Sequence, residues 1–368
     1  MMIIIFFICL LNSSKQEIYG RSKRDFYVIL TKTIPFTLNP NNQMMTEVCI
    51  GTPPQCFPFK IATNMNACFV FSSNLTAKGY NPSLSSTASP RGNQVYFEHS
   101  KSKYSGVIQK DVFTVANSTL TLQDFPFYLV TNGELSKYFK GVIGLGRMYI
   151  EPQFSFIKTA IKQKFLHKHI FSFQYLPDES RGYLTIGYHD TSNKLEYRKT
   201  PMIETKYEPY FETNLTGIIY TKNKVKGPPI VRTYMHEQAV LFSPGASHIF
   251  CPVSFFKFII EKFIEDDFHE KFDLCELDDR IPNFVTLTCE EKILKKELGS
   301  LMFIFQKWNI ELSFKDLFVK CKNKVCLDIV QINDENKWIF GYPFLKRYPL
   351  IFDVELSSFF IKISKISE

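Results

Sequence analysis

The sequence predicts a mainly β fold made of two related lobes that face each other across a central cleft. The 368 residues are 45% hydrophobic and 15% aromatic, which is enough apolar material for two lobes rather than one. The 37 Phe and 18 Tyr favour strands. Most of the chain consists of short apolar or alternating runs between turn residues, a pattern typical of strands.

The expected elements follow from that pattern. Strands are predicted at 26–33, 45–50, 57–61, 107–115, 171–175 and 183–188, and the alternation at 359–366 predicts a last one. Two segments are predicted to be helical, 152–164 and 252–272, the second because its apolar residues follow helical spacing.

A weak internal repeat is the observation that predicts two lobes. In the first half, the apolar strand ending at Ala62 is followed later by the run G-V-I-G-L-G at 141–146. In the second half, the strand ending at Ser243 is followed by W-I-F-G at 338–341. Each half therefore pairs an apolar strand with a later hydrophobic segment that ends in glycine.

The N-terminus predicts secretion. Residues 1–11 are almost wholly apolar and precede small polar residues, as in a signal peptide over 1–14. The run R-S-K-R at 21–24 is typical of a proprotein-convertase site, which would make 15–24 a short pro-region. Three N-x-S/T triplets, at Asn74, Asn117 and Asn214, are glycosylation candidates that agree with this compartment.

Eight cysteines follow Cys9, and an even number in a secreted chain predicts disulfides. Zinc is the competing interpretation, but the pair Cys321 and Cys326 has no second pair or histidine at ligand spacing, so we expect no metal and no cofactor. The net charge of +8 is spread through the chain and predicts a basic surface, with no motif for nucleic acid. We expect a monomer with no membrane span.

Several motifs in order resemble those of pepsin-like aspartic peptidases, peptidase family A1. The most specific is I-G-T-P-P-Q at 50–55, which leads into an apolar strand. The other matches are Y-N-P-S-L-S-S-T at 80–87, Ser105-Gly106 with Asp111, G-V-I-G-L-G at 141–146, F-S-F at 171–173, G-Y-L-T-I-G at 182–187, and W-I-F-G at 338–341 with Phe344, Phe352 and Asp353. The resemblance covers roughly 45–365 and implies a bilobal pepsin-like fold, with lobes at 25–200 and 201–368. It also implies an interlobe cleft for an extended peptide, covered by a hairpin flap.

The same resemblance places Ala62 and Ser243 at the positions of the two catalytic aspartates, so no catalytic residue is assigned. Peptide hydrolysis in this family needs two carboxylates that share a proton, one acting as base and the other as acid. Ser243 and His248 could suggest a serine nucleophile, but the sequence shows neither an acidic orienter nor an oxyanion hole for them. We therefore predict that the chain is not an enzyme.

Other positions change with the aspartates. Thr63 is kept, but its partner position is Pro244, which has neither N–H nor hydroxyl. His99 falls where the flap tyrosine is expected, and a one-residue gap would replace it by Tyr96 or Tyr104. The predicted peptide-cleft residues are Thr63, Asn64, His99, Gly245, Ala246 and Tyr342. The resemblance further implies a disulfide from Cys289 to Cys326 or Cys321, and Cys275 is a further disulfide candidate.

Three functions remain open. The favoured one is an inactive secreted homologue that binds an extended peptide or protein ligand in its cleft. The second is a structural or antigenic secreted glycoprotein with a filled cleft. The third is an active endopeptidase with unorthodox residues. Retained peptide binding separates the first from the second, and turnover would establish the third.

Overall fold

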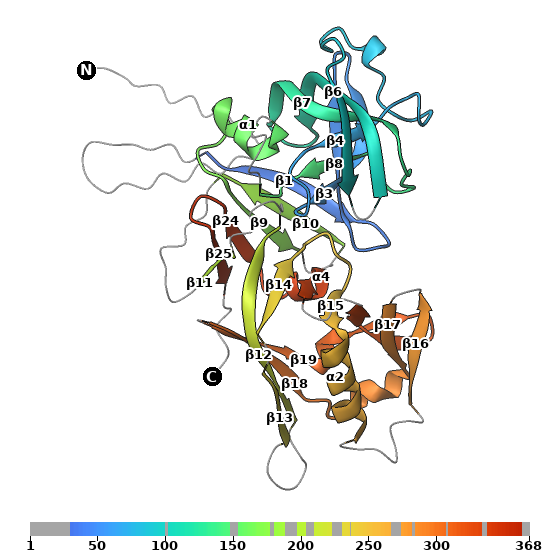
Figure 1. The fold of residues 1–368 in the computed structure, drawn as a ribbon, viewed down its shortest axis with the longest axis vertical. Helices are drawn as coiled ribbons and strands as arrows, with labels where there is room; N and C mark the ends of the chain where they lie inside the picture. The colour runs from blue at the N-terminus through green and yellow to red at the C-terminus, as the bar shows by residue number, and fades with distance from the viewer. Residues whose placement is uncertain are drawn as a thin grey trace, which may run out of the picture.

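The computed structural model describes residues 30–99, 102–147, 154–176, 180–187, 197–203, 210–222, 230–235, 237–265, 274–281, 284–306, 308–332 and 337–362. These residues form two bodies, each built on a large sheet (Figure 1). The predicted mainly β, two-lobed fold is therefore confirmed. The predicted signal peptide and pro-region lie outside the described residues, and the division at residue 200 stays a prediction.

The first sheet has 13 strands in the order β11-β25-β24-β9-β10-β1-β2-β3-β8-β4-β7-β6-β5. Its strands are β1 (Lys32–Leu38), β2 (Met44–Ile50), β3 (Gln55–Ala62), β4 (Phe69–Phe71), β5 (Gln94–His99), β6 (Ser102–Val115), β7 (Thr121–Asn132), β8 (Gly141–Gly144), β9 (Ile170–Tyr175), β10 (Arg181–Ile186), β11 (Tyr197–Pro201), β24 (Leu350–Asp353) and β25 (Ser358–Lys362). Helix α1 (Phe156–Lys162) and the 3₁₀ turn η1 (Pro82–Leu84) accompany it.

The second sheet has 12 strands. They are β12 (Glu212–Lys222), β13 (Ile230–Tyr234), β14 (Gln238–Phe242), β15 (Ile249–Pro252), β16 (Cys275–Ile281), β17 (Phe284–Cys289), β18 (Ser300–Phe305), β19 (Asn309–Ser313), β20 (Phe318–Cys321), β21 (Lys324–Leu327), β22 (Ile329–Ile332) and β23 (Lys337–Phe340). Helices α2 (Val253–Glu265) and α4 (Tyr342–Leu345) and the turns η3 (Glu291–Lys295) and η4 (Phe314–Leu317) complete this half.

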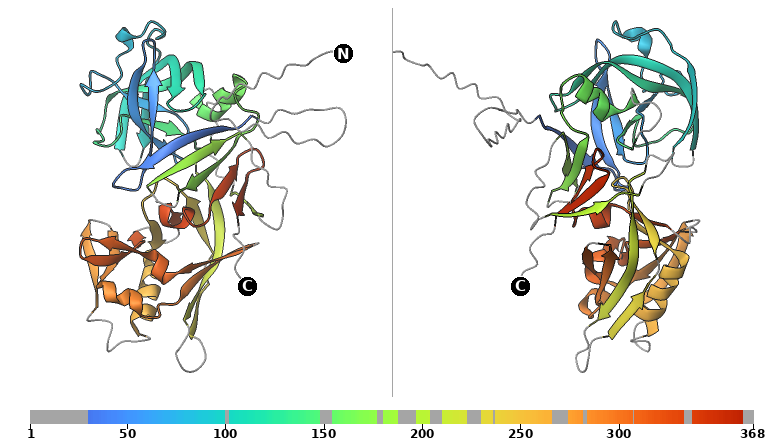
Figure 2. Two further views of the ribbon diagram at one scale, coloured as in Figure 1. Left: turned by 180° about the vertical axis from the view of Figure 1, so that it is seen from behind. Right: turned by 60° about the vertical axis from the view of Figure 1, so that its left-hand side comes forward.

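The last two strands of the chain return to the first sheet. In Figure 2, β24 and β25 lie beside the strands of the first body rather than within the second. Phe352 of β24 is opposite Phe171 of β9, and their rings stack with centroids 4.8 Å apart. Phe211, just before β12, packs edge-on against both rings. Buried aromatic rings therefore join the two halves, which explains much of the high phenylalanine content.

Most predicted strands are confirmed to within a few residues, but the first is wrong. It was expected at 26–33; residues 26–29 lie outside the described residues, 30 and 31 are not in a strand, and β1 begins at Lys32 and runs to Leu38. Ile34 and Phe36 alternate with more exposed residues in that strand and turn to the core, and the sequence prediction missed this alternation. Helix α2 occupies the first part of the predicted helix at 252–272, and 266–273 lie outside the described residues. No helix among the described residues is long and apolar enough to cross a membrane.

The disulfide pairing differs from the one implied by the resemblance. Cys289 bonds to Cys275, and Cys321 bonds to Cys326. The reason is strand register, because Cys275 and Cys289 are directly opposite each other in the β16–β17 ladder. The third disulfide joins Cys49 and Cys56, which are opposite each other on β2 and β3.

The predicted presence of disulfides is confirmed, but two of the eight cysteines after Cys9 are not in a disulfide. Cys68 and Cys251 are free, and both are completely buried. Each lies in the hydrophobic core, where a thiol packs as a small apolar group. Burial raises the pKa of the Cys68 thiol to about 12, so neither position has the thiolate character of a reactive cysteine.

Candidate functional site

Two parallel strand pairs, one in each half, hold the loops that carry Ala62 and Ser243. β3 runs parallel to β8, with Ala62 beside Gly144. β14 runs parallel to β23, with Phe242 beside Phe340. In each pair the loop leaves the end of the apolar strand and passes over the end of its neighbour. The repeat seen in the sequence therefore corresponds to a repeated structural unit.

Each loop is pressed against a glycine at the end of the neighbouring strand: Gly144 is the last residue of β8, and Gly341 directly follows β23. A Cβ on Gly144 would lie 2.3 Å from the carbonyl oxygen of Ala67, and a Cβ on Gly341 would lie 2.4 Å from that of Ala246. Those separations are far below van der Waals contact, so only glycine fits at either place. Backbone hydrogen bonds close the contact in both halves: Leu145 N–H donates to Ala62 O at 2.8 Å, and Tyr342 N–H donates to Ala246 O at 2.9 Å.

The two loops meet at Gly245. A Cβ placed on Gly245 would lie 3.4 Å from the carbonyl oxygen of Ile61 and 3.5 Å from Cε of Lys60. Gly245 belongs to the second-lobe loop, while Ile61 and Lys60 are the last residues of β3 before Ala62. The structure therefore brings the loops of Ala62 and Ser243 together as one site.

The surroundings of Ala62 are apolar. Ala62 is 1% exposed and belongs to a buried cluster that includes Met65, Phe69 and Val142. Ser243 is 8% exposed, and its N–H donates to Phe340 O at 3.0 Å. Neither an alanine methyl group nor a serine hydroxyl ionises in the pH range in which a carboxylic acid does. Residues 62 and 243 therefore supply neither the base nor the acid of a carboxyl pair that shares a proton.

The environment of Thr63 shows the consequence of having proline at position 244, the position expected to hold its hydrogen-bond partner. The Thr63 side chain is 1% exposed, and its hydroxyl has no hydrogen-bond partner in the part of the chain that the structure describes. The expected partner position is Pro244, which offers neither an N–H nor a hydroxyl. A buried hydroxyl without a partner destabilises a fold by about 1–3 kcal/mol. The loops are therefore held by their glycine contacts and backbone hydrogen bonds rather than by this threonine.

The flap is the β5–β6 hairpin, and His99 is the residue that it turns inward. His99 lies opposite Ser102 at the tip, is 5% exposed, and packs its ring 5.9 Å from that of Phe69. Tyr96 is 75% exposed, and Tyr104 stacks on Phe97 within the aromatic cluster. Of the three residues considered for the flap tyrosine position, His99 and Tyr104 are therefore buried and Tyr96 is exposed. Burial, and secondly the charge of Lys60, lower the pKa of His99 to about 4.

Lys60 is a site residue that the sequence analysis missed. Its side chain is buried, at 8% exposed, and it makes no hydrogen bond or ion pair with any residue that the structure describes. Burial lowers the pKa of this amine. The signal was available, because a lysine two residues before Ala62 in an apolar strand must point to the same face as Ala62.

The structure supplies an acidic orienter for His248 that the sequence analysis did not find. The ring nitrogen Nδ1 of His248 lies 2.5 Å from Oδ1 of Asp328, at the junction of β21 and β22. A serine nucleophile also needs a hydrogen bond to that histidine. Ser243 makes none with His248 among the described residues, so these three side chains do not form a catalytic triad here.

The remaining predicted cleft residues differ in exposure. Asn64, Gly245 and Ala246 are partly exposed. Tyr342 is 6% exposed, lies on α4 and packs its ring 5.1 Å from that of Tyr175. Tyr342 is thus part of the packed wall behind the second loop.

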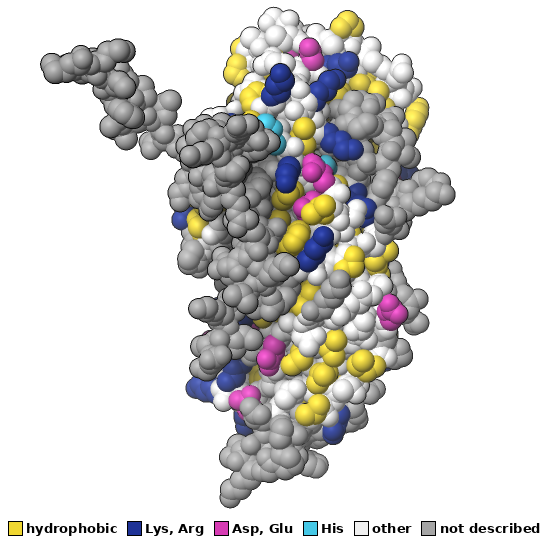
Figure 3. Space-filling model, turned by 90° about the vertical axis from the view of Figure 1, so that its left-hand side faces the viewer, with side chains coloured by type: hydrophobic (Ala, Val, Ile, Leu, Met, Phe, Trp, Pro, Cys, Tyr) yellow, Lys and Arg dark blue, Asp and Glu magenta, His cyan; other side chains and the backbone are white. Residues whose placement is uncertain are grey.

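A cavity of about 490 Å³ lies away from these loops. It borders on Phe36, Glu47, Asn117 and Arg181, among others, and on none of the residues predicted to line the cleft. Asn117 and Asn74, two of the glycosylation candidates, are exposed, and Asn214 is half-buried. On the described part of the face in Figure 3, basic side chains are interspersed with acidic and apolar ones.

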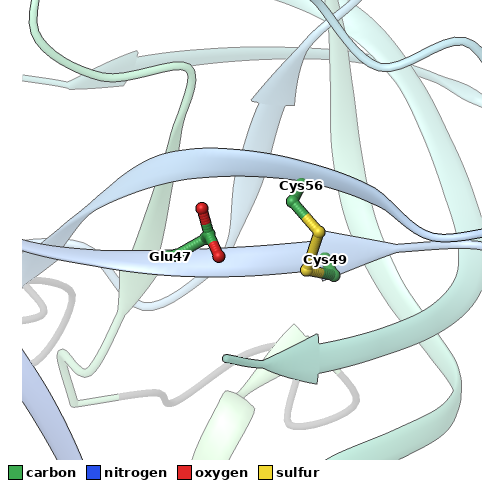
Figure 4. A group of neighbouring side chains, drawn as sticks. All are labelled: Glu47, Cys49 and Cys56. Atoms are coloured by element: carbon green, nitrogen blue, oxygen red, sulfur yellow. A yellow bond between two sulfur atoms is a disulfide. The ribbon is translucent and has the colours of Figure 1, made fainter. Parts of the chain in front are cut away.

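One group among the described residues has the composition of a metal site, Glu47 with Cys49 and Cys56. Figure 4 shows that the two sulfur atoms are bonded to each other, beside the carboxylate of Glu47. Sulfur in a disulfide is not a thiolate, and the thiolate is the form that binds zinc. These three residues therefore belong to the β2–β3 hairpin, in which the two cysteines are bonded to each other and offer no thiolate.

The chain matches known proteins over most of its length. The family model "Eukaryotic aspartyl protease" matches residues 43–361. Plasmepsin IV of Plasmodium falciparum is 26% identical over 343 residues, which cover 86% of this chain and 68% of that protein. Vacuolar protease A of Neurospora crassa is 26% identical over 201 residues, 52% of this chain and 50% of that protein, and pregnancy-associated glycoprotein 2 of Sus scrofa is 27% identical over 173 residues, 44% and 41%. The chain thus spans about half the length of the last two relatives.

Proposed function

The chain belongs to the eukaryotic aspartyl protease family. From that premise we propose that it is a secreted member of the family that does not hydrolyse peptides. We propose that it instead binds an extended peptide or protein ligand between its lobes. One observation carries the proposal. The loops of Ala62 and Ser243 meet through Gly245 and Ile61, as the two halves of one site, yet neither loop brings a carboxylate.

The absence of carboxylates at the two loops supports the loss of hydrolysis. The family's reaction needs one carboxylate to activate water and a second to protonate the leaving amine. General acid–base catalysis contributes about 10²- to 10⁴-fold for each proton transfer. The methyl group of Ala62 does neither, and the neutral hydroxyl of Ser243 is far too weak an acid to replace a carboxylic acid.

The retained frame supports ligand binding. Both glycine contacts, both parallel strand pairs and an inward-facing flap residue, His99, are present although no reaction requires them. A cleft between two lobes is the usual place for a ligand, and an extended peptide needs only this shape and edge hydrogen bonds.

Three disulfides among the described residues support secretion, because disulfides persist in oxidising compartments. The predicted signal peptide at 1–14 and the three glycosylation triplets also support secretion. Secretion is tested by expressing the full chain in a eukaryotic cell and assaying the medium for a protein that shortens on deglycosylation.

A second candidate is a structural glycoprotein whose cleft is filled. The observation that favours it is the burial of the side chains around the first loop, where Ala62 and Met65 pack within an aromatic cluster. Tyr342 is likewise buried at the second loop. This candidate predicts a molecule that folds and is secreted but binds no peptide between its lobes.

A binding assay separates the two. The full chain is immobilised and exposed to a library of short peptides with blocked ends, and bound peptides are counted by mass spectrometry. We expect enrichment by the unmodified chain and its loss in Ala246→Trp, which fills the space beside the partly exposed second loop. Ala88→Trp, on a partly exposed loop of the first lobe, is the matched control. No enrichment above the immobilised support would exclude ligand binding and favour the filled cleft.

A further inference from the structure

Lys60 and His99 lie on the same face of the first sheet, next to the site. In the sheet register, Lys60 is beside Val142, and Val142 is beside Phe69, so these three side chains form a row across β3, β8 and β4. The ring of His99 packs on Phe69 from the flap above this row. The stem of Lys60 reaches the second-lobe loop at Gly245. The pair therefore lies where the flap and the two loops converge.

Neither polar group has a partner among the residues that the structure describes. Nε2 of His99 is fully buried and makes no hydrogen bond with them. The Lys60 side chain is 8% exposed and makes no hydrogen bond or ion pair with any described residue. An unpaired cation or ring nitrogen in such a place is unfavourable, which is why buried charges in proteins are almost always paired. Here the surroundings are apolar: the residues of the cluster beside Ala62 are aliphatic or aromatic.

We propose that Lys60 and His99 form a pocket for a carboxylate, supplied by an Asp or Glu side chain of the extended peptide bound between the lobes. The inference rests on the proposed function and names the chemistry of its ligand. The ammonium of Lys60 pairs with the negative charge, and Nε2–H of His99 donates a hydrogen bond to a carboxylate oxygen.

The chemistry of the pair selects a carboxylate among anions. Lys60 is a single point charge with no second cation in hydrogen-bond contact, and His99 is neutral at neutral pH because its pKa is lowered to about 4. One cation and one neutral donor match a group with one negative charge and two acceptor oxygens. A phosphate carries up to two negative charges and three oxygens, and sites for it are typically built from arginines or several backbone N–H groups.

Peptide binding with a single changed residue tests the pocket. The probes are blocked, amidated peptide pools with no acidic residue except one fixed position, which is Glu in one pool and Gln in its match. The full chain is compared with Lys60→Met, which keeps length and removes charge, and with Lys110→Met, which removes an exposed lysine of the same lobe. A third pool has a free C-terminus as its only carboxylate.

We expect the unmodified chain to prefer the Glu pool over the Gln pool by about 10- to 100-fold at one fixed position, as loss of a hydrogen bond to a charged group usually causes. The preference should vanish in Lys60→Met and persist in Lys110→Met. Lys60→Arg, which keeps the charge, should retain part of it if Lys60→Met fails to fold. His99→Phe should weaken it.

Equal binding of the Glu and Gln pools, or a Glu preference that survives Lys60→Met, overturns the pocket while leaving peptide binding in place. A Lys60-dependent preference confined to the free C-terminus overturns the side-chain assignment and assigns the pocket to a terminal carboxylate. Absence of binding to every pool overturns the proposed function itself and the pocket with it.

Discussion

The loop after β3 and the loop after β14 share one backbone frame but differ in polar chemistry. In both, a glycine at the end of a parallel neighbour strand contacts the loop, Gly144 at Ala67 and Gly341 at Ala246. In the first loop the buried Thr63 hydroxyl has no partner among the described residues, and Lys60, in the strand before the loop, makes no hydrogen bond or ion pair with them. In the second, Pro244 removes both donors that Thr63 could have met.

The difference shows that the frame and the reactive groups are specified separately. Glycine contacts and backbone hydrogen bonds determine where the loops lie, and none of them involves the side chains of residues 62 or 243. The contacts that position the loops therefore do not depend on which side chains stand at residues 62 and 243. The fold alone, for the same reason, does not determine the function.

The largest expected effect is on the shared frame. Gly144→Ala and Gly341→Ala each place a methyl group 2.3 or 2.4 Å from a backbone oxygen, far inside van der Waals contact, and the backbone must shift to relieve the clash. We expect each to lower the free energy of unfolding by at least about 3 kcal/mol, the upper range for overpacking. Chemical denaturation of the purified variants measures this.

Gly245→Ala is the matched control for these two. Its added Cβ would meet Ile61 O at 3.4 Å, an ordinary contact, so we expect a change within about 1 kcal/mol. Equal losses of stability in all three glycine variants would contradict the description of the frame as two contacts, each between a loop and the glycine beside it.

A smaller effect is expected at the flap as the pH falls. The pKa of His99 is about 4 in the folded chain and near 6.5 when unfolded. The unfolded chain therefore takes up the proton first, so stability is complete above pH 6.5 and falls as the pH drops towards 4. Between neutral pH and pH ~5, His99 should account for a loss of about 2 kcal/mol.

His99→Phe should remove that part of the loss, measured by urea denaturation at the two pH values. His169, whose pKa is lowered to about 3 mainly by burial, will still lower the free energy of unfolding as the pH falls. The exposed His167, changed to Phe, should leave the pH dependence as it is. Identical pH profiles for the unmodified chain and His99→Phe would mean that His99 is not held neutral by the flap.

The smallest expected effect concerns the hydroxyl of Thr63. Thr63→Val removes a buried group without a partner and keeps the shape, so it should raise the free energy of unfolding by about 1 kcal/mol or leave it unchanged. Thr213→Val is the control, because the buried Thr213 hydroxyl donates to Pro201 O at 3.1 Å, and its loss should lower stability by about 1 kcal/mol. A loss at Thr63 as large as at Thr213 would show that Thr63 has a partner.

The sequence predicted the fold class and the strands that carry the site because these depend on apolar runs and ordered motifs. The disulfides could not be predicted in this way, because pairing of Cys275 with Cys289 depends on the register of a hairpin. The sequence left three residues open for the flap tyrosine position, and their different burial depends on the hairpin register, in which His99 lies opposite Ser102. Strand alternation places Lys60 on the same face as Ala62, but its burial and its lack of a partner among the described residues appear only in the folded chain.

The central claim is that the frame of a peptidase is kept here without its catalysis. The most direct test is proteolysis of a diverse peptide mixture from acid to neutral pH by the full chain and by Ala62→Asp/Ser243→Asp. We predict no cleavage by the unmodified chain and cleavage by the double variant, since the loops already meet and lack only the two carboxylates. Cleavage by the unmodified chain that persists through repurification would contradict the claim.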